Sequence, residues 1–102
     1  MSMHAIFKAL GDPVRLEIVT RLSDGSSYTI GKLSENLGVS RQGARKQIQA
    51  LASAELIQLR PVGRETQVSL NTESLQQARL FITNLEQQWD QRLQALKQLT
   101  EE

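Results

Sequence analysis

The chain has 102 residues, of which 39% are apolar and 23% are charged, a composition ordinary for one soluble globular domain. It contains no cysteine, which excludes disulfide bonds, thiolate metal sites and cysteine nucleophiles. No apolar run has the length of a membrane span, and the N-terminus lacks a signal-peptide pattern, so we expect a cytoplasmic protein. The net charge is only +1, but residues 1–52 carry seven basic against four acidic residues.

Two short helices are predicted at the start of the chain. The first covers residues 3–10, and Gly11 ends it. Asp12 and Pro13 open the second helix, because Asp is a good N-cap and Pro suits the first helical position. The apolar stripe of this second helix comprises Val14, Leu16, Ile18, Val19 and Leu22. A turn-rich loop over residues 24–27 follows it.

A third, shorter helix is predicted after Tyr28, which is extended or lies in a loop. Thr29 can cap this helix, and Gly38 ends it. Its inward-facing residues are Ile30, Leu33 and Leu37.

Residues 40–54 form the helix on which the functional prediction rests. Ser40 is a suitable N-cap, because its hydroxyl can accept a free amide hydrogen of the first turn. At about 100° per residue, the apolar Ala44, Ile48 and Leu51 share one side. The other side carries no acid and comprises Arg41, Gln42, Arg45, Lys46 and Gln49. Such side chains contact phosphates and base edges, so the short helix, the glycine-containing turn and this helix predict a helix-turn-helix.

A β-hairpin is predicted next, because the hydrophobic period changes. Residues 56–62 form its first strand, and Pro61 suits an exposed end or an edge of the sheet. Residues 65–70 alternate polar and apolar side chains, which directs Val68 and Leu70 inward.

The hairpin carries two arginines, Arg60 on one arm and Arg64 beside Gly63 in the turn. A hairpin with a basic tip that directly follows a helix-turn-helix is typical of a DNA-binding wing. The alternative is a hairpin that only covers the core, with its arginines in solvent.

The last predicted helix covers residues 72–99 and contains neither Gly nor Pro. At 1.5 Å per residue it spans roughly 40 Å, which is longer than a core built from residues 3–71 can cover. Its apolar stripe would be wet in a monomer, so we expect a homodimer. The predicted dimer surface comprises Ile6, Phe7 and Leu10 from the first helix and Phe81, Leu85, Trp89, Leu93 and Leu96 from the last.

These elements resemble the arsenic-repressor-like (ArsR/SmtB) winged helix-turn-helix transcriptional regulators. The sequence FKALGDPVRLEIVTRL is similar to the family's opening, and SRQGARKQIQALASAELIQLRPVGRETQVSLN is similar to its recognition helix and wing. The resemblance covers nearly the whole of residues 1–102 as one domain. It implies a homodimer that pairs through the first and last helices and represses transcription at a palindromic operator in double-stranded DNA. It also implies that Arg41, Gln42 and Arg45 face the major groove, with Ser40 and Lys46 nearer to phosphate.

Metal-sensing members of this family carry ligands that this chain lacks. Residues 29–40 contain neither Cys nor His, and His4 is the single histidine. A lone imidazole cannot build a site of three or four ligands, so we expect no metal and no cofactor, as in the family's metal-free branch. The sequence leaves open whether a small apolar effector binds between the first and last helices or no effector exists.

Two residues of the helix over residues 40–54 depart from the family pattern. Gln47 stands where the family usually has a histidine, and Gly43 weakens the helix by about 1 kcal/mol relative to alanine. These departures leave the operator sequence unpredicted, whereas the predicted fold is unaffected.

Two other functions are alternatives to DNA binding. An enzyme is disfavoured, because the chain has no catalytic triad, no phosphate-binding glycine loop and no carboxylate pair in a cleft. The stronger rival is a winged-helix module that binds protein without specific DNA binding. The basic outer face of residues 41–49 favours DNA, since a protein-binding version would expose apolar residues there. The sequence thus predicts a mainly α fold with a small β-hairpin, a winged helix-turn-helix with a long C-terminal dimerisation helix.

Overall fold

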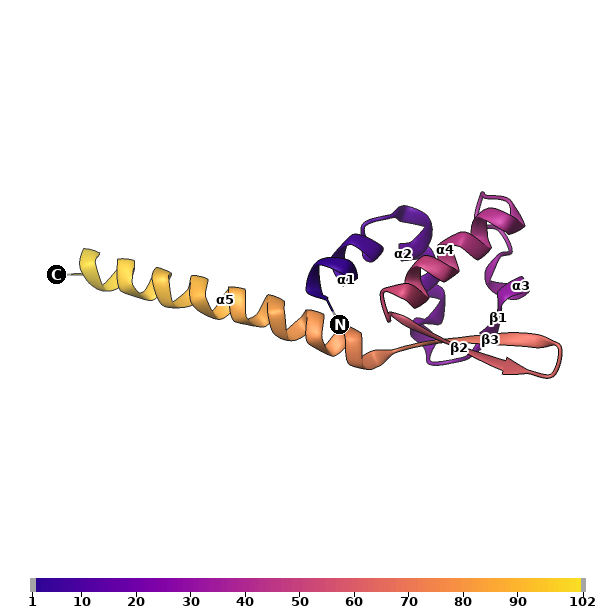
Figure 1. Ribbon diagram of the computed structural model, residues 1–102. Helices are drawn as coiled ribbons and strands as arrows, with labels where there is room; N and C mark the ends of the chain where they lie inside the picture. Colours follow the sequence, from indigo (N-terminus) through magenta and orange to yellow (C-terminus); the bar gives the residue numbers. More distant parts are fainter. Residues whose placement is uncertain (1, 102) are drawn as a thin grey trace.

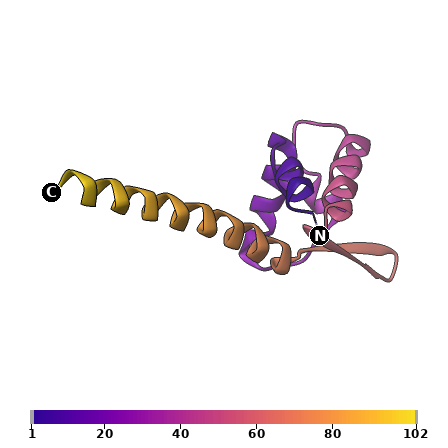
Figure 2. The same cartoon turned by 60° about the vertical axis from the view of Figure 1, so that its left-hand side comes forward.

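A computed structural model describes residues 2–101 and shows two unlike parts: short helices packed on a small sheet, and one long projecting helix (Figure 1, Figure 2). The molecule is 69 Å long but only 25 and 23 Å across. In chain order the elements are α1 (Met3–Leu10), α2 (Pro13–Arg21), the 3-10 turn η1 (Leu22–Asp24), β1 (Tyr28–Thr29), α3 (Ile30–Leu33), α4 (Arg41–Ser53), β2 (Ile57–Val62), β3 (Glu65–Leu70) and α5 (Thr72–Thr100). Within the described residues, no helix combines the length and hydrophobicity that a membrane crossing requires.

The predicted helix starts are confirmed by their caps. Asp12 Oδ2 accepts the amide hydrogens of the second and third residues of α2 at 2.9 and 3.0 Å, and Pro13 is the first helical residue. Thr29 Oγ1 accepts from the third residue of α3 at 3.1 Å, and Ser40 Oγ does the same for α4 at 3.0 Å. Asn71 Oδ1 caps α5 by accepting the amide hydrogen of its second residue at 3.2 Å. Each cap satisfies amide groups that lack a partner inside the helix.

The sheet has three antiparallel strands in the order β1-β3-β2, so it is larger than the predicted hairpin. The hairpin itself is confirmed, and its last pair before the turn is Val62 with Glu65. Tyr28 pairs with Val68 and adds β1 to the other edge of β3. Pro61 lies on β2, an edge strand, where its missing N–H costs no hydrogen bond to a further strand.

The third helix is shorter than predicted. It ends at Leu33, and a turn continues to the start of α4. Asn36 has a φ of 57° and Gly38 a φ of 76°, both in the left-handed region, which an α-helix cannot contain. Leu37 is half-buried against the core although it lies outside the helix.

The core lies where α1, α2, α4 and the sheet meet, and the first turns of α5 close it. Ser74 and Ala78 of α5 are buried there, whereas all residues from Asn84 to Glu101 are exposed. The largest fully buried apolar side chains are Ile6, Ile18, Leu22, Leu33, Ile48, Leu51, Leu56 and Val68.

Two sequence predictions about burial are corrected. Ile6 was predicted to join the dimer surface, but its side chain is 0% exposed in its own core and leaves no surface for a partner. Phe7, the next residue, is turned about 100° around α1 and is partly exposed. Leu16 was assigned to the apolar stripe of α2, but it is 51% exposed.

Candidate nucleic-acid interface

The helix α4 has the two faces that the sequence predicts. Its inner face buries Ala44, Ile48 and Leu51, of which none is more than 1% exposed. This burial fixes the helix on the core of its own chain. The outward side chains are all exposed: Arg41, Gln42, Arg45, Lys46 and Gln49.

Gly43 has a local role at the start of α4. Its N–H donates to the Ser40 hydroxyl, and a β-carbon at residue 43 would lie 3.2 Å from Ser40 Oγ and 3.6 Å from Val39 Cβ. A side chain there would crowd the cap, so glycine lets Ser40 approach the helix closely. Glycine therefore fits this crowded position although its helix propensity is low.

The basic residues of α4 and the wing are free to bind a ligand. Within residues 2–101, none of Arg41, Arg45, Lys46, Arg60 and Arg64 forms a hydrogen bond or an ion pair, and all five are exposed. The outward face of α4 also carries no acid that could neutralise them. This surface is therefore a cluster of unpaired cations, suited to a polyanion.

Arg15 of α2 supports α4 from behind, a role that the sequence reasoning missed. Its guanidinium donates to the carbonyl oxygens of Ala9 at 2.8 Å and Lys8 at 3.4 Å, at the end of α1. It also donates to Gln47 Oε1 on α4 at 2.7 Å. One side chain thus joins α1, α2 and α4, and Gln47 has a structural partner.

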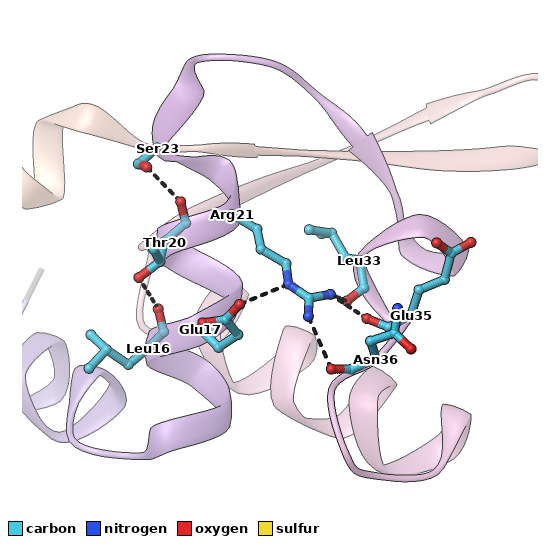
Figure 3. Close-up of polar contacts among 8 residues, drawn as sticks. All are labelled: Leu16, Glu17, Thr20, Arg21, Ser23, Leu33, Glu35 and Asn36. Atoms are coloured by element: carbon cyan, nitrogen blue, oxygen red, sulfur yellow. Dashed lines mark hydrogen bonds and ion pairs between the residues drawn. The ribbon is translucent and has the colours of Figure 1, made fainter.

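Arg21 holds the turn between α3 and α4 in the same manner (Figure 3). Its guanidinium donates to the carbonyl oxygens of Leu33 at 3.0 Å and Asn36 at 3.2 Å, and to that of Glu35. Glu17, one turn earlier on α2, accepts from its Nε at 3.1 Å. These bonds satisfy carbonyl groups left free by the end of α3 and position the turn that leads into α4.

The wing tip and α4 lie at the end of the molecule opposite to the C-terminus (Figure 1, Figure 2). Gly63 has a φ of 62°, which glycine adopts without strain, and this conformation presents Arg64 at the tip. Arg64 and Arg45 both line one hollow between the wing and α4, whereas Arg60 lies outside it. The structure thus brings together two residues predicted to bind DNA, Arg45 of α4 and Arg64 of the wing.

A polar contact joins the end of η1 to β1. The Tyr28 hydroxyl donates to Asp24 Oδ2, and the Ser26 amide donates to Asp24 Oδ1 at 2.9 Å. The Tyr28 bond and then the Ser26 bond lower the pKa of Asp24 below its usual value, and the same contact raises the pKa of Tyr28. Both shifts favour the state in which Tyr28 is protonated and Asp24 is ionised.

Within residues 2–101, the outer part of α5 carries an apolar stripe that the rest of the chain leaves largely exposed. Phe81 touches Phe7 of α1, with ring centroids 5.7 Å apart and ring planes 55° from parallel. Phe81 nevertheless remains 44% exposed, and Trp89 is 60% exposed. The stripe continues to the end of the helix through Leu85, Trp89, Leu93, Leu96 and Leu99.

Within the part of the chain that the structure describes, no three His, Asp or Glu side chains gather in a way that could hold a metal ion. His4 is exposed on α1. Metal independence stays a prediction.

Comparison with known proteins places this geometry in a family. The helix-turn-helix domain family matches residues 10–60, which run from the end of α1 into β2. The transcriptional repressor SdpR of Bacillus subtilis (strain 168) is 32% identical over 82 residues, which cover 80% of this chain and 90% of that protein.

Solved structures agree with the sequence comparison. An ArsR-like transcriptional regulator from Rhodococcus sp. RHA1 has a TM-score of 0.83 and 32% identity, covering 95% of this chain and 91% of that chain. The homodimeric winged helix-turn-helix DNA-binding domain from Mycobacterium bovis has a TM-score of 0.65 at 20% identity, covers 81% of this chain and 77% of that one, and supports the fold alone. The chain therefore belongs to the helix-turn-helix domain family and is a DNA-binding transcriptional regulator of the ArsR type.

Proposed function

We propose that the protein is a homodimeric repressor that binds an inverted-repeat operator through α4 and the wing. The observation that carries the proposal is the cluster of unpaired cations on a helix whose other face is fixed in the core. Backbone phosphates neutralise such a cluster, and guanidinium and amide groups can bind the edges of bases in the major groove. The protein would act in the cytoplasm, where its operator is, without catalysing a reaction on the DNA.

In this proposal, some residues of α4 contact bases, while the others and those of the wing contact the DNA backbone or the minor groove. Arg41 and Gln42, in the first turn of α4, contact base edges, because the N-terminal residues of a recognition helix enter the groove most deeply. Ser40 and Lys46 lie nearer to phosphate, and Gln49 lies further along the same face. Arg60 and Arg64 extend the contact from the wing to the backbone or the minor groove.

The dimer follows from the apolar stripe of α5. Trp89 is the largest anchor on it, and its burial between subunits would stabilise the dimer by about 2–3 kcal/mol. Phe7 of α1, which contacts Phe81, extends the proposed surface, and Leu10 would join it with the part that its own core leaves uncovered, whereas Ile6 would not contribute. Two copies would place two recognition helices about 34 Å apart, which suits half-sites one helical turn apart. The Mycobacterium bovis domain of the same fold is a homodimer, in line with this proposal.

Repression is supported by the relative SdpR, which is a transcriptional repressor. The rival function, a module that binds protein through the helix-turn-helix, is disfavoured by the outward face of α4. That face exposes only Arg, Gln and Lys side chains between residues 41 and 49, whereas most of the large exposed apolar residues lie on α5.

A selection experiment tests the proposal. The wild-type protein is used to enrich 30-bp duplexes from a random library, and the enriched sequences are aligned. We expect an inverted repeat with half-site centres about 10 bp apart and binding that weakens steeply with salt. Placed across a reporter promoter, the enriched site should lower expression when the protein is present. Failure to enrich any sequence, or binding insensitive to salt, would overturn the proposal.

A further inference from the structure

The wing and α4 enclose a hollow of about 300 Å³ at the DNA-facing end of the molecule. It is lined by polar side chains from three elements and by the first residues of α3. The polar side chains are Thr29, Arg45, Arg64, Glu65 and Thr66. The hollow therefore joins the recognition helix, the wing and β1 in one polar site.

The charges around this hollow are unbalanced. Arg45 from α4 and Arg64 from the wing tip contribute two guanidinium groups, against the single carboxylate of Glu65. Within residues 2–101, Glu65 forms no ion pair with either arginine, and neither arginine has any other hydrogen-bond partner. Two like charges on one hollow repel each other, and an anion bound between them would remove that repulsion.

The other donors match a tetrahedral oxyanion. A guanidinium group binds phosphate oxygens with two parallel N–H bonds, and two such groups can bind one phosphate from opposite sides. Thr29 Oγ1 already accepts an amide hydrogen from Lys32 at 3.1 Å, which leaves its O–H as a donor. Thr66 adds a second hydroxyl near the tip of the wing.

We propose that Arg45 and Arg64 together bind one backbone phosphate of the DNA in this hollow, a proposal that rests on the DNA binding proposed above. The phosphate then ties the wing to α4 and fixes the angle at which both meet the duplex. Arg45 is accordingly a phosphate ligand and not a base-reading residue, although it shares a helical face with Arg41. Sequence preference comes from the first turn of α4, which lies outside the hollow.

A double-mutant cycle tests this proposal. The affinity of wild type, Arg45→Ala, Arg64→Ala and the double variant is measured by fluorescence anisotropy on a duplex enriched by the wild type, over a range of potassium chloride concentrations. We expect each single variant to lose about tenfold in affinity, and the double variant to lose little more than either. The slope of log K against log salt should fall by about 0.9 per protomer in the double variant.

Arg60→Ala is the matched control, because Arg60 lies on the same hairpin but outside the hollow. In a double variant of Arg60→Ala and Arg45→Ala, the loss of affinity should equal the product of the two single losses. If the losses of Arg45→Ala and Arg64→Ala instead multiply to about 100-fold per protomer, and the slope falls by about 1.8 per protomer, the two arginines bind separate phosphates. The shared site would then be wrong.

Two further outcomes separate the proposals. If the wild-type protein binds no duplex from the library, the proposed function itself is contradicted. If the affinity losses of Arg45→Ala and Arg64→Ala multiply in the double variant, only the shared phosphate site is contradicted. Inorganic phosphate at matched ionic strength serves as the probe for a free-anion site. We expect it to raise the melting temperatures of the wild type and of Arg45→Ala by the same amount, because phosphate stabilises folded proteins generally through exclusion from their surface. Stabilisation by phosphate that Arg45→Ala abolishes, together with multiplicative losses on DNA, would assign the hollow to a free anion instead.

Discussion

Within residues 2–101, the outward faces of α4 and α5 are both left exposed, but their chemistry is opposite. The face of α4 presents unpaired cations and amides, and that of α5 presents a stripe of large apolar side chains up to Leu99. Water solvates the first surface well, whereas it is a poor solvent for Trp89. The difference indicates two partners of different kinds, an anion for α4 and a second apolar surface for α5.

The two helices also differ in how they are held. The inner face of α4 is buried in its own core, and Arg15 anchors Gln47 from behind. From Arg79 to Thr100, no residue of α5 is buried. The outward face of α4 is therefore positioned by contacts within one chain. The outer half of α5, in contrast, would pack only against a second copy of the chain.

The largest effect is expected from breaking the α5 surface. Replacing Trp89→Glu and Leu93→Glu together should give monomers and lower operator affinity more than 100-fold, because two charges would be buried between subunits. Sedimentation at micromolar concentration measures the assembly. The control Gln87→Glu with Gln91→Glu adds the same charge to the opposite side of the helix and should leave the dimer intact. A single 11.4 kDa species for the wild type would contradict the dimer.

A smaller effect is expected from the α4 surface. Arg41→Ala should cost about 1–3 kcal/mol on the enriched operator and relax the preference at one base position, since a bidentate contact to a base edge is lost. The unfolding free energy should not change, because Arg41 has no partner within residues 2–101. Arg79→Ala on α5 is the control. Normal operator affinity of Arg41→Ala would remove this residue from the base-reading role.

Unlike Arg41, Arg15 forms hydrogen bonds within the chain, so its replacement should change the unfolding free energy. Arg15→Met should lower the unfolding free energy by about 1–2 kcal/mol, because the bonds to Ala9, Lys8 and Gln47 are lost. Urea unfolding at one fixed protein concentration measures this, since the stability of a dimer depends on concentration. A variant as stable as the wild type would mean that α4 is held by its apolar face alone.

Lys46→Ala should change affinity least among the DNA-facing variants, and equally on all sequences. A lysine that binds phosphate carries no base information, so the enriched and scrambled duplexes should weaken in parallel. The slope of log K against log salt should fall by about 0.9 per protomer. A selective loss on the enriched duplex would instead place Lys46 at a base.

No effect is expected from metals. Zinc or arsenite at stoichiometric concentration should leave the DNA complex intact, because the chain has no cysteine, one histidine and no ligand cluster among residues 2–101. Fluorescence anisotropy of the preformed complex measures release. Zinc bound at one equivalent that lowers operator affinity would reveal a site formed between subunits.

Features that depend on near neighbours in the chain could be predicted from the sequence. The caps at Asp12, Thr29 and Ser40, the two faces of α4, and the turn at Gly63 are confirmed, because a cap or a period needs only three or four adjacent residues. The β1 strand was not predicted, because two residues carry no period and only pairing with β3 makes them a strand.

The sequence by itself therefore determined the order of the elements and the chemistry of their faces, since propensity and periodicity act locally. The tertiary structure alone decided which basic residues are free. Arg15 and Arg45 are both arginines on amphipathic helices, but Arg15 finds a partner 32 positions away and Arg45 lines a hollow with Arg64 of the wing. It also decided that Ile6 is a core residue while Phe7 is partly exposed, because packing against α5 sets how α1 is rotated. Contacts between residues far apart in the chain have no local signal, and they separate the arginines that build this domain from those that can bind DNA.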